Sequence, residues 1–263
     1  MDLQISGNTA LVTASSSGLG KASAKALARE GANVVVNGRS QDSLDEAVEE
    51  IREVATGEVI GVQADLTEAD DIENLVQTTV SEFGSLDHLV TSAGGPPSGP
   101  FLETTDEDWY DAFDLLVMSV VRLVRESADH LAAGDGGTVV NITSRSVKEA
   151  IPSLVLSNAV RMSVIGLEKT LSRELAPEIR VNSVLPGPHE TRRIRDLIEQ
   201  GVERGEYASY EDGLAARGES NPLTRIGKPM ELGDTVAYLS SPLSGYINGT
   251  ALPIDGGLGN SNL

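Results

Sequence analysis

The stretch that decides the fold is T-A-L-V-T-A-S-S-S-G-L-G, residues 9–20. Its first four residues form an apolar run that is typical of a buried strand, and a helical segment, Gly20–Glu30, follows. The backbone amides of a glycine-rich turn at a helix N-terminus can approach a pyrophosphate closely. The stretch therefore predicts a dinucleotide-binding unit of strand, turn and helix. The alternative is an ordinary tight turn between a strand and a helix.

Short apolar runs alternate with helical segments along the whole chain, which is typical of parallel βαβ units. The runs are mostly continuous, as expected of strands that are covered on both faces. They span residues 9–12, 33–36, 59–63, 86–90, 137–142, 180–184 and 251–254. We therefore predict an α/β fold, a Rossmann-type doubly wound parallel sheet of about seven strands with helices on both faces. Its ligand should bind at the carboxyl ends of the strands.

No linker or change of composition divides the chain, so one domain is expected over residues 1–263. Residues 188–225 are polar and irregular, and we expect a lid or substrate loop there. Cysteine is absent, which excludes disulfides and thiolate metal sites, and no other metal-ligand spacing is present. Neither a signal peptide nor an apolar run of membrane-spanning length is evident, so we expect a cytoplasmic protein without a membrane partner.

The charge balance is strongly acidic, with a formal net charge of −20 and a pI near 4.4. Such a surface argues against binding to nucleic acid or to anionic membranes. Lysine is scarce, and most of the cations are arginines. This combination favours a halophilic protein, and the alternative is an ordinary acidic enzyme.

Further motifs accompany the glycine-rich turn. They are Asp65-Leu66, Ala93-Gly94, Pro186-Gly187 with Thr191, the segment G-L-E-K-T-L-S-R-E-L-A-P at 166–177, R-I-G-K-P at 225–229, and D-G-G at 255–257. With these motifs the chain resembles the short-chain dehydrogenase/reductase family over its whole length, especially its 3-oxoacyl-[acyl-carrier-protein] reductase-like members. In that family the turn reads T-G-x-x-x-G-x-G, so Ala14 replaces its first glycine. An alanine there is costly if the position requires a positive φ.

The resemblance implies an NAD(P)(H)-dependent oxidoreductase that acts on a carbonyl or alcohol substrate. It also implies the residues that bind the cofactor, which are Thr13, Ala14, Ser15, Ser17, Gly18, Leu19, Gly20, Arg39, Asp65, Leu66, Ala93, Gly94, Arg161, Pro186, Gly187 and Thr191. An acid at the end of the second strand would bind the ribose 2′-hydroxyl of NAD, but Gly38 stands near that place and Arg39 follows. An arginine can pair with a 2′-phosphate, which favours NADP(H). The alternative is a surface arginine with less selective binding of NAD(H).

The resemblance leaves the catalytic residues unusual. Ser144 matches the family's serine, whereas Ser157 and Arg161 stand at the positions of its tyrosine and lysine, and Leu116 at that of its asparagine. A serine hydroxyl is too weak an acid to replace the tyrosine, and an arginine stays protonated. His189 lies near the expected nicotinamide and titrates in the useful range, so it is a candidate acid. The candidate catalytic set is therefore Ser144, Ser157, Arg161 and His189, and the alternative is that these residues only line the cofactor pocket.

Two further features concern the substrate. Tyr207 and Tyr210, in the expected lid, are other candidate proton donors. Several cations fall in segments expected near the active site, which suits an anionic substrate such as a phosphate, carboxylate or thioester carrier. They are Arg145, Lys148, Arg161, Arg192, Arg193 and Arg195. The alternative is that the last three form the solvated face of a lid helix.

The altered catalytic positions leave more than one function open. The leading interpretation is an oxidoreductase with an atypical active site, and the alternative is a catalytically inactive nucleotide-binding sensor or partner subunit. A redox-neutral enzyme resembling the halohydrin dehalogenases fits less well, because those enzymes keep the tyrosine. The resemblance also implies a homotetramer or homodimer, with helices at residues 116–123 and 160–171 as interface candidates.

Overall fold

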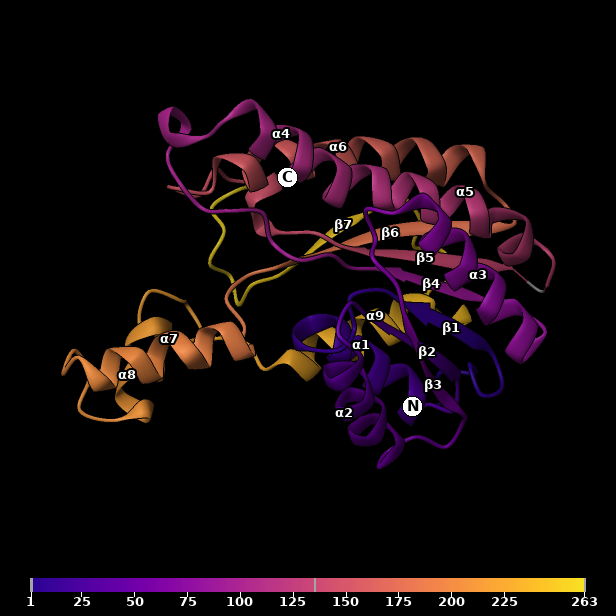
Figure 1. The fold of residues 1–263 in the computed structure, drawn as a ribbon, viewed down its shortest axis with the longest axis horizontal. Helices are drawn as coiled ribbons and strands as arrows, with labels where there is room; N and C mark the ends of the chain where they lie inside the picture. Colours follow the sequence, from indigo (N-terminus) through magenta and orange to yellow (C-terminus); the bar gives the residue numbers. More distant parts are fainter. Residues whose placement is uncertain (1, 135, 263) are drawn as a thin grey trace.

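The structure, a computed structural model, describes residues 2–134 and 136–262, with the side chain of Arg193 also outside the description. Its core is one parallel sheet in the order β3-β2-β1-β4-β5-β6-β7 (Figure 1). The strands are β1 Thr9–Val12, β2 Asn33–Gly38, β3 Val59–Gln63, β4 His88–Thr91, β5 Gly137–Ile142, β6 Ile179–Pro186 and β7 Ala251–Ile254. Each predicted apolar run is therefore a strand, and the doubly wound α/β prediction is confirmed.

Helices cover both faces of the sheet. They are α1 Gly18–Arg29, α2 Gln41–Arg52, α3 Ala69–Phe83, α4 Asp106–Phe113, α5 Ser119–Ala132, α6 Val155–Glu174, α7 Arg192–Glu203, α8 Tyr210–Gly218 and α9 Pro229–Ser240. Figure 1 shows α1, α2 and α9 on one face and α3, α5 and α6 on the other. Successive residues of the central strands enter opposite apolar clusters, Val12 with α1, α2 and α9, and Leu11 with α3, α5 and α6. This two-sided burial explains why the strands are continuously apolar.

The strand order reverses beside β1. From β1 the chain passes to β2 and β3 on one side, and it returns through β4 to the other side of β1. The loops that leave β1 and β4 therefore diverge at their carboxyl ends. In open α/β sheets this divergence forms the crevice in which ligands bind.

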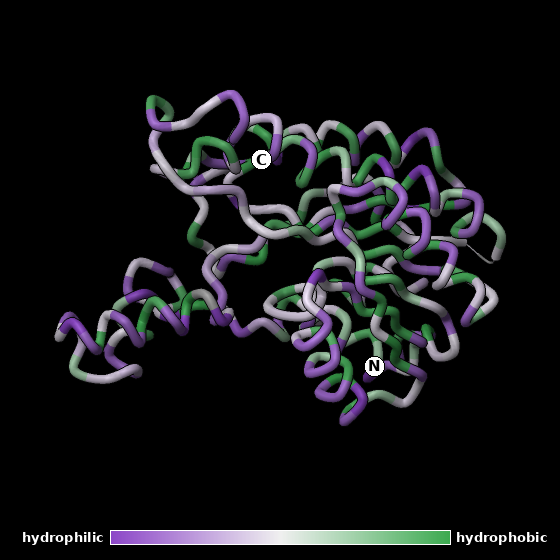
Figure 2. The backbone as a smooth tube through the Cα atoms, in the orientation of Figure 1, coloured by the Kyte–Doolittle hydropathy of each residue, from purple (hydrophilic) through white to green (hydrophobic). Residues whose placement is uncertain are grey.

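The expected irregular loop at 188–225 contains two helices instead, α7 and α8, which project from the body of the molecule (Figure 1). The apolar side chains of α7 stabilise this helix by packing on one side of it. Ile198 is fully buried, while its neighbour Leu197 remains 37% exposed. Figure 2 shows hydrophilic and hydrophobic residues alternating along both helices, in contrast to the largely hydrophobic strands. No helix in the described part of the chain combines the length and apolar character needed to cross a membrane.

His88 shows how completely the sheet is buried. Its imidazole is 2% exposed and contacts the Thr138 hydroxyl at 2.9 Å and the Asn8 amide at 3.0 Å. Burial lowers the pKa of His88 from 6.5 to about 4, with Asp87 opposing the shift. The histidine is therefore a neutral structural group.

We predict that His88 makes the protein sensitive to acid. Below pH 6.5 the unfolded chain binds a proton that the folded chain excludes until about pH 4, so the stability present above pH 6.5 is lost as pH falls. Between pH 8 and pH 5 this amounts to about 2 kcal/mol. Urea unfolding of His88→Gln should show a correspondingly flatter pH dependence than the wild type. Parallel curves for His88→Gln and the wild type would contradict the assignment.

Candidate active site

A cavity of about 430 Å³, called the main cavity, opens at the carboxyl ends of the central strands. Loops after β1, β2, β3 and β4 meet there with β5, α6 and the end of β6. The predicted cofactor residues that line it are Ala14, Ser17, Leu19, Gly20, Arg39, Asp65, Leu66, Ala93, Gly94, Arg161 and Pro186. The sequence motifs therefore converge on one site at the reversal of strand order.

The other predicted cofactor residues lie around this cavity. The Thr13 hydroxyl accepts from the Ser92 amide and donates to the Ser92 carbonyl, both at 2.8 Å, so it ties two loops together. Ser15 is buried and donates to the carbonyl of Val12. Gly187 packs against Asp255, where a Cβ would lie only 2.7 Å from the aspartate Cβ. These residues build the walls without lining the cavity.

Gly18 and Thr191 line an adjoining cavity of about 580 Å³, called the lid cavity, which shares Ser16 and Ser17 with the main cavity. Helix α1 begins at Gly18 without a side-chain cap on its N-cap residue Ser17, and its first turn carries no acid. The amides at this helix end are therefore suited to an anion. This arrangement fits the diphosphate of a dinucleotide.

The glycine-rich turn has the strained geometry that its sequence suggested. Gly18 has φ +59° and Ala14 has φ +45°, in the left-handed region. At Gly20 a Cβ would lie 2.5 Å from the carbonyl oxygen of Ala14, so only glycine lets α1 start this close to the turn. Ala14 thus holds a conformation that favours the glycine of the family pattern.

We predict that Ala14→Gly stabilises the protein by about 1 kcal/mol, because it removes the strain of a left-handed alanine. Thermal unfolding followed by circular dichroism would measure the gain. Ala215→Gly makes the same chemical change on the exposed face of α8. That control should destabilise by up to about 1 kcal/mol, and equal signs for the two variants would contradict the role of φ.

Asn37 is a residue of the site that sequence reasoning missed. It is 1% exposed, its Oδ1 accepts from the Ala14 amide at 3.0 Å, and its Nδ2 donates to the carbonyls of Val62 and Ala64. Its backbone also exchanges hydrogen bonds with Ser15. One buried amide therefore fixes the turn against β2 and β3. The available signal was a polar residue directly after the apolar run 34–36.

One end of the main cavity carries Arg39 and Asp65. The Asp65 carboxylate accepts from the amide and hydroxyl of Thr67, at 3.0 and 2.8 Å, and the amide hydrogen bond is the main cause of its lowered pKa. Arg39 is exposed and forms no ion pair within the described residues. A Cβ on Gly38 would lie 2.9 Å from the Ser16 side chain, so an acidic side chain there would require Ser16 to move.

Arg161 lies at the inner end of the main cavity. The residue is 9% exposed, and its Nη2 donates a 3.5 Å hydrogen bond to the carbonyl of Gly94. Burial lowers the pKa of Arg161 to about 10, so the guanidinium still carries its charge at neutral pH. A much smaller space, of about 10 Å³, is lined by both Arg161 and Leu116. Leu116 belongs to the short π-helical segment 114–118. The cavity therefore ends in a desolvated cation.

Hydrogen bonds link three serines between the segment after β5 and α6. Ser157, one turn before Arg161 on α6, is 8% exposed and its hydroxyl lies 3.2 Å from that of Ser146. The Ser146 amide in turn donates to the hydroxyl of Ser144 at 3.1 Å. Ser146 therefore connects the two serines singled out by the sequence, and it was not foreseen. Neither Ser144 nor Ser157 is among the residues that line the main cavity.

His189 lies apart from these residues. It lines a separate cavity of about 320 Å³ with Gly227 and Asp255, and its Nδ1 is 3.0 Å from the carbonyl of Gly187. The ring is 4% exposed, and burial lowers its pKa. The sequence placed His189 near the expected nicotinamide, whereas in the structure its ring packs on Gly227 and does not line the main cavity. In the lid, Tyr207 packs on Gly201 and Gly213, and the Tyr210 hydroxyl donates to Glu190.

The predicted cluster of cations is also divided. Arg192 and Arg195 line the lid cavity, where Arg195 pairs with Glu190 at 3.2 Å, and the side chain of Arg193 lies outside the description. Arg145 and Lys148 line another cavity, of about 330 Å³, together with residues of the C-terminal segment. Among the five described side chains of this set, Arg161 alone lines the main cavity.

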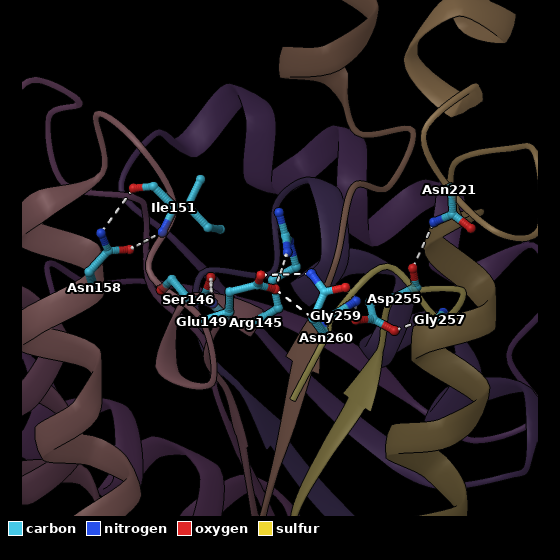
Figure 3. Close-up of polar contacts among 11 residues, drawn as sticks. Arg145, Ser146, Glu149, Ile151, Asn158, Asn221, Asp255, Gly257, Gly259 and Asn260 are labelled. Atoms are coloured by element: carbon cyan, nitrogen blue, oxygen red, sulfur yellow. Dashed lines mark hydrogen bonds and ion pairs between the residues drawn. The ribbon is translucent and has the colours of Figure 1, made fainter. Parts of the chain in front are cut away.

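The C-terminal segment is fixed to the loop that carries Arg145 (Figure 3). Glu149 accepts from Arg145 at 3.4 Å and from the Asn260 amide group at 2.8 Å. Asn158 holds the same loop by donating to the carbonyl of Ile151 and accepting from its amide. Arg145 is thereby engaged by a carboxylate, unlike Arg161.

Comparison with known proteins agrees with this geometry. Residues 13–259 match the family model described as enoyl-(acyl carrier protein) reductase. An uncharacterised oxidoreductase of Bacillus subtilis is 32% identical over 262 residues, covering 98% of both chains. A 3-oxoacyl-[acyl-carrier-protein] reductase of Synechocystis is 33% identical over 258 residues, covering 97% of this chain and 98% of the relative.

Solved structures extend the likeness to three dimensions. L-sorbose reductase from Gluconobacter frateurii, complexed with NADPH and L-sorbose, matches with a TM-score of 0.93 and 30% identity, over 99% of this chain and 100% of the other. A variant of actinorhodin polyketide ketoreductase with NADPH matches with a TM-score of 0.86 and 32% identity, over 97% and 98%. Sequence, fold and site together show that the chain belongs to the short-chain dehydrogenase/reductase family of oxidoreductases.

Proposed function

We propose that this protein transfers hydride between NADP(H) and a carbonyl or alcohol substrate at the inner end of the main cavity. The observation that carries the proposal is the convergence of the glycine-rich turn, Arg39, Asp65 and Arg161 on one cavity at the reversal of strand order. The NADPH complexes of two similar structures support the choice of cofactor.

The cofactor would lie along the cavity with its adenine half between Arg39, Asp65 and Leu66 and its nicotinamide half near Arg161 and Pro186. Arg39 would pair with the 2′-phosphate, and the start of α1 would bind the diphosphate. The placement is supported by the lining of the cavity, since residues proposed for both halves border the same space.

Bound NADPH would supply the hydride, and the side chains at the inner end would manage the charge on the substrate oxygen. The fixed positive charge of Arg161 lowers the energy of an oxygen that becomes negative. Ser144 and Ser157 do not line the main cavity, so a hydrogen bond from either hydroxyl to the carbonyl would require a local side-chain movement. Arg161 stays protonated, so the proton that completes reduction would come from water or from the substrate.

The cofactor choice predicts the effect of Arg39→Glu. Loss of the arginine and the repulsion between a carboxylate and a 2′-phosphate should weaken NADPH binding by roughly 10–100-fold. NADH binding should change little, because NADH lacks this phosphate. Nicotinamide fluorescence would measure both affinities. Arg204→Glu makes the same charge change on the lid surface and serves as control, and equal weakening of both cofactors by Arg39→Glu would contradict the assignment.

Turnover tests the function itself. NADPH oxidation would be followed by absorbance with ketones, aldehydes, oxoacyl thioesters and small oxo acids as substrates. We expect substrate-dependent oxidation, and reduction of NADP⁺ with the corresponding alcohol. Saturating NADPH binding with no oxidation by any class would contradict hydride transfer and leave a nucleotide-binding role.

We also propose a homodimer or homotetramer in a cytoplasmic, salt-rich environment. Large apolar side chains are exposed around α4 and α6, and a second group surrounds α9 and β7. They are Phe101, Leu102, Tyr110, Phe113 and Met162, and Tyr238, Leu243, Tyr246 and Leu252. Exposed apolar patches mark association surfaces. Separately, the net charge of −20 supports the proposal of a salt-rich environment. Light scattering at low and high salt would measure the assembly, and a monomer at every salt concentration would contradict it.

A further inference from the structure

The C-terminal segment begins with a turn that is fixed by side chains. Asp255 directly follows β7, and its carboxylate accepts from the amides of Gly257 at 3.0 Å and Gly259 at 2.9 Å. The side-chain amide of Asn221, which is 5% exposed, donates to the Asp255 carbonyl at 2.7 Å. An aspartate that bonds to its own turn restricts the backbone there, and the buried amide holds the same residue. Residues 255–259 therefore form a fixed base for the segment that follows.

Beyond this turn the segment contacts the loop that follows β5. Asn260 donates from its side chain to Oε1 of Glu149 at 2.8 Å, and from its backbone amide to Oε2 at 3.4 Å. The same Oε2 accepts from Arg145 at 3.4 Å. The hydrogen bond from the Asn260 side chain is the main cause of a lowered pKa at Glu149. Glu149 therefore joins two segments that are 111 residues apart in sequence (Figure 3).

The loop held by Glu149 carries one of the candidate catalytic residues. Residues 145–147 form a single 3-10 turn whose N-cap is Ser144, and the Glu149 amide donates back into this turn at 3.3 Å. The Ser144 hydroxyl accepts from the Ser146 amide at 3.1 Å. Thr143, directly before Ser144, lines the main cavity. A displacement of Glu149 is therefore transmitted through one short turn to Ser144.

We propose that Glu149 is a positioning residue, which together with Asn260 fixes the loop that places Ser144 beside the main cavity. This inference rests on the proposed function, because it concerns the placement of a serine in the same site. The Ser144 hydroxyl has to reach the substrate by a local side-chain movement. A fixed loop backbone leaves only that side chain to be ordered when the substrate binds, which preorganises the site.

Hydrogen exchange of the protein without cofactor tests the contact itself. Asn260→Ala should speed exchange of the amides at 146–151 by roughly 3–10-fold, which corresponds to the loss of one hydrogen bond. Asn260→Asp should have at least this effect, because it places a second carboxylate against Glu149. Asn262→Ala, which truncates an exposed side chain of the same segment, should leave the exchange unchanged. Unchanged exchange in both Asn260 variants would overturn the proposal.

A reversed pair distinguishes positioning from a general loss of structure. In the double variant Glu149→Gln with Asn260→Asp, the glutamine nitrogen replaces Oε1 and donates to the introduced carboxylate. The glutamine oxygen replaces Oε2 and still accepts from Arg145. Exchange of the amides at 146–151 should return close to the wild-type rate, a non-additive result that shows direct coupling. A double variant that exchanges as fast as Asn260→Asp would overturn the pairing, and circular dichroism would establish that each variant is folded.

Steady-state kinetics test the catalytic consequence. NADPH would be used with whichever of the ketones, aldehydes, oxoacyl thioesters and oxo acids the wild type reduces fastest. Asn260→Ala should lower kcat by roughly 10-fold, since a misplaced group can reduce the rate by up to about 100-fold. KM for NADPH should not change, because neither Asn260 nor Glu149 lines the main cavity. The reversed pair should recover kcat, and wild-type kcat in an Asn260→Ala protein with faster exchange would overturn the positioning role.

The two proposals fail in different ways. A wild type that binds neither NADPH nor NADH refutes the proposed function and with it the effect on kcat, while the exchange rates still decide whether Glu149 and Asn260 fix the loop. Intact NADPH turnover with unchanged exchange in the Asn260 variants refutes the positioning role and leaves the proposed function standing.

Discussion

The Gly20→Ala protein is expected to lose NADPH-dependent turnover, with kcat/KM reduced by roughly 100-fold or more, because displacement of a site by about 1 Å can have an effect of that size. The added Cβ would lie 2.5 Å from the Ala14 carbonyl oxygen and 3.0 Å from Ser15 Cα, both backbone atoms. Neither atom can withdraw freely, since Asn37 holds the amide of Ala14 and the backbone of Ser15. The start of α1 would therefore move away from the diphosphate position.

Gly166→Ala is the matched control, because the space around Gly166 on α6 is open. This variant should retain turnover and gain up to about 1 kcal/mol of stability from the better helix propensity of alanine. NADPH titration and steady-state kinetics on both variants would give the comparison. A Gly20→Ala protein that binds and oxidises NADPH like the wild type would show that the turn at residues 13–20 is not the cofactor site.

Arg161→Met is expected to make the ligand-free protein more stable and the enzyme nearly inactive. Because burial lowers the pKa of this cation, its charge reduces the free energy of unfolding at every pH below about 10. Removing the charge removes that penalty. Methionine fills a similar volume, and the gain should be on the order of 1–3 kcal/mol. Turnover should fall by roughly 100-fold, the effect of losing one preorganised group that stabilises an oxyanion.

Urea unfolding without cofactor and steady-state kinetics would measure the two effects of Arg161→Met. Arg161→Lys keeps a cation and should show a smaller gain in stability and a smaller loss of turnover. A methionine variant that is less stable than the wild type would mean that Arg161 contributes to the fold. Wild-type turnover in the same variant would remove Arg161 from the site.

Much of the fold could be predicted because its signals are local. Continuous apolar runs such as residues 137–142 identified the buried parallel strands, and the glycines of residues 13–20 identified the turn. The helices of the lid were harder to predict from the sequence, because α7 and α8 are polar helices with a narrow apolar stripe that includes Ile198.

Only the parts of the site that local sequence motifs form could be predicted. Asp65 and Arg39 follow strands whose carboxyl ends must meet, so their convergence was foreseeable. The separation of Arg145 from Arg161 was not, because it depends on how the C-terminal segment holds Glu149. His189 shows the same limit, since its position near Gly187 in sequence did not reveal that its ring turns onto another cavity.

The measurement that tests the central claim most directly is titration of the purified protein with NADPH and, separately, NADH in concentrated salt, followed by nicotinamide fluorescence. We expect saturable binding of NADPH, tighter than that of NADH, and loss of that preference in Arg39→Glu. Failure to bind either nucleotide would contradict the claim that the main cavity is a dinucleotide site.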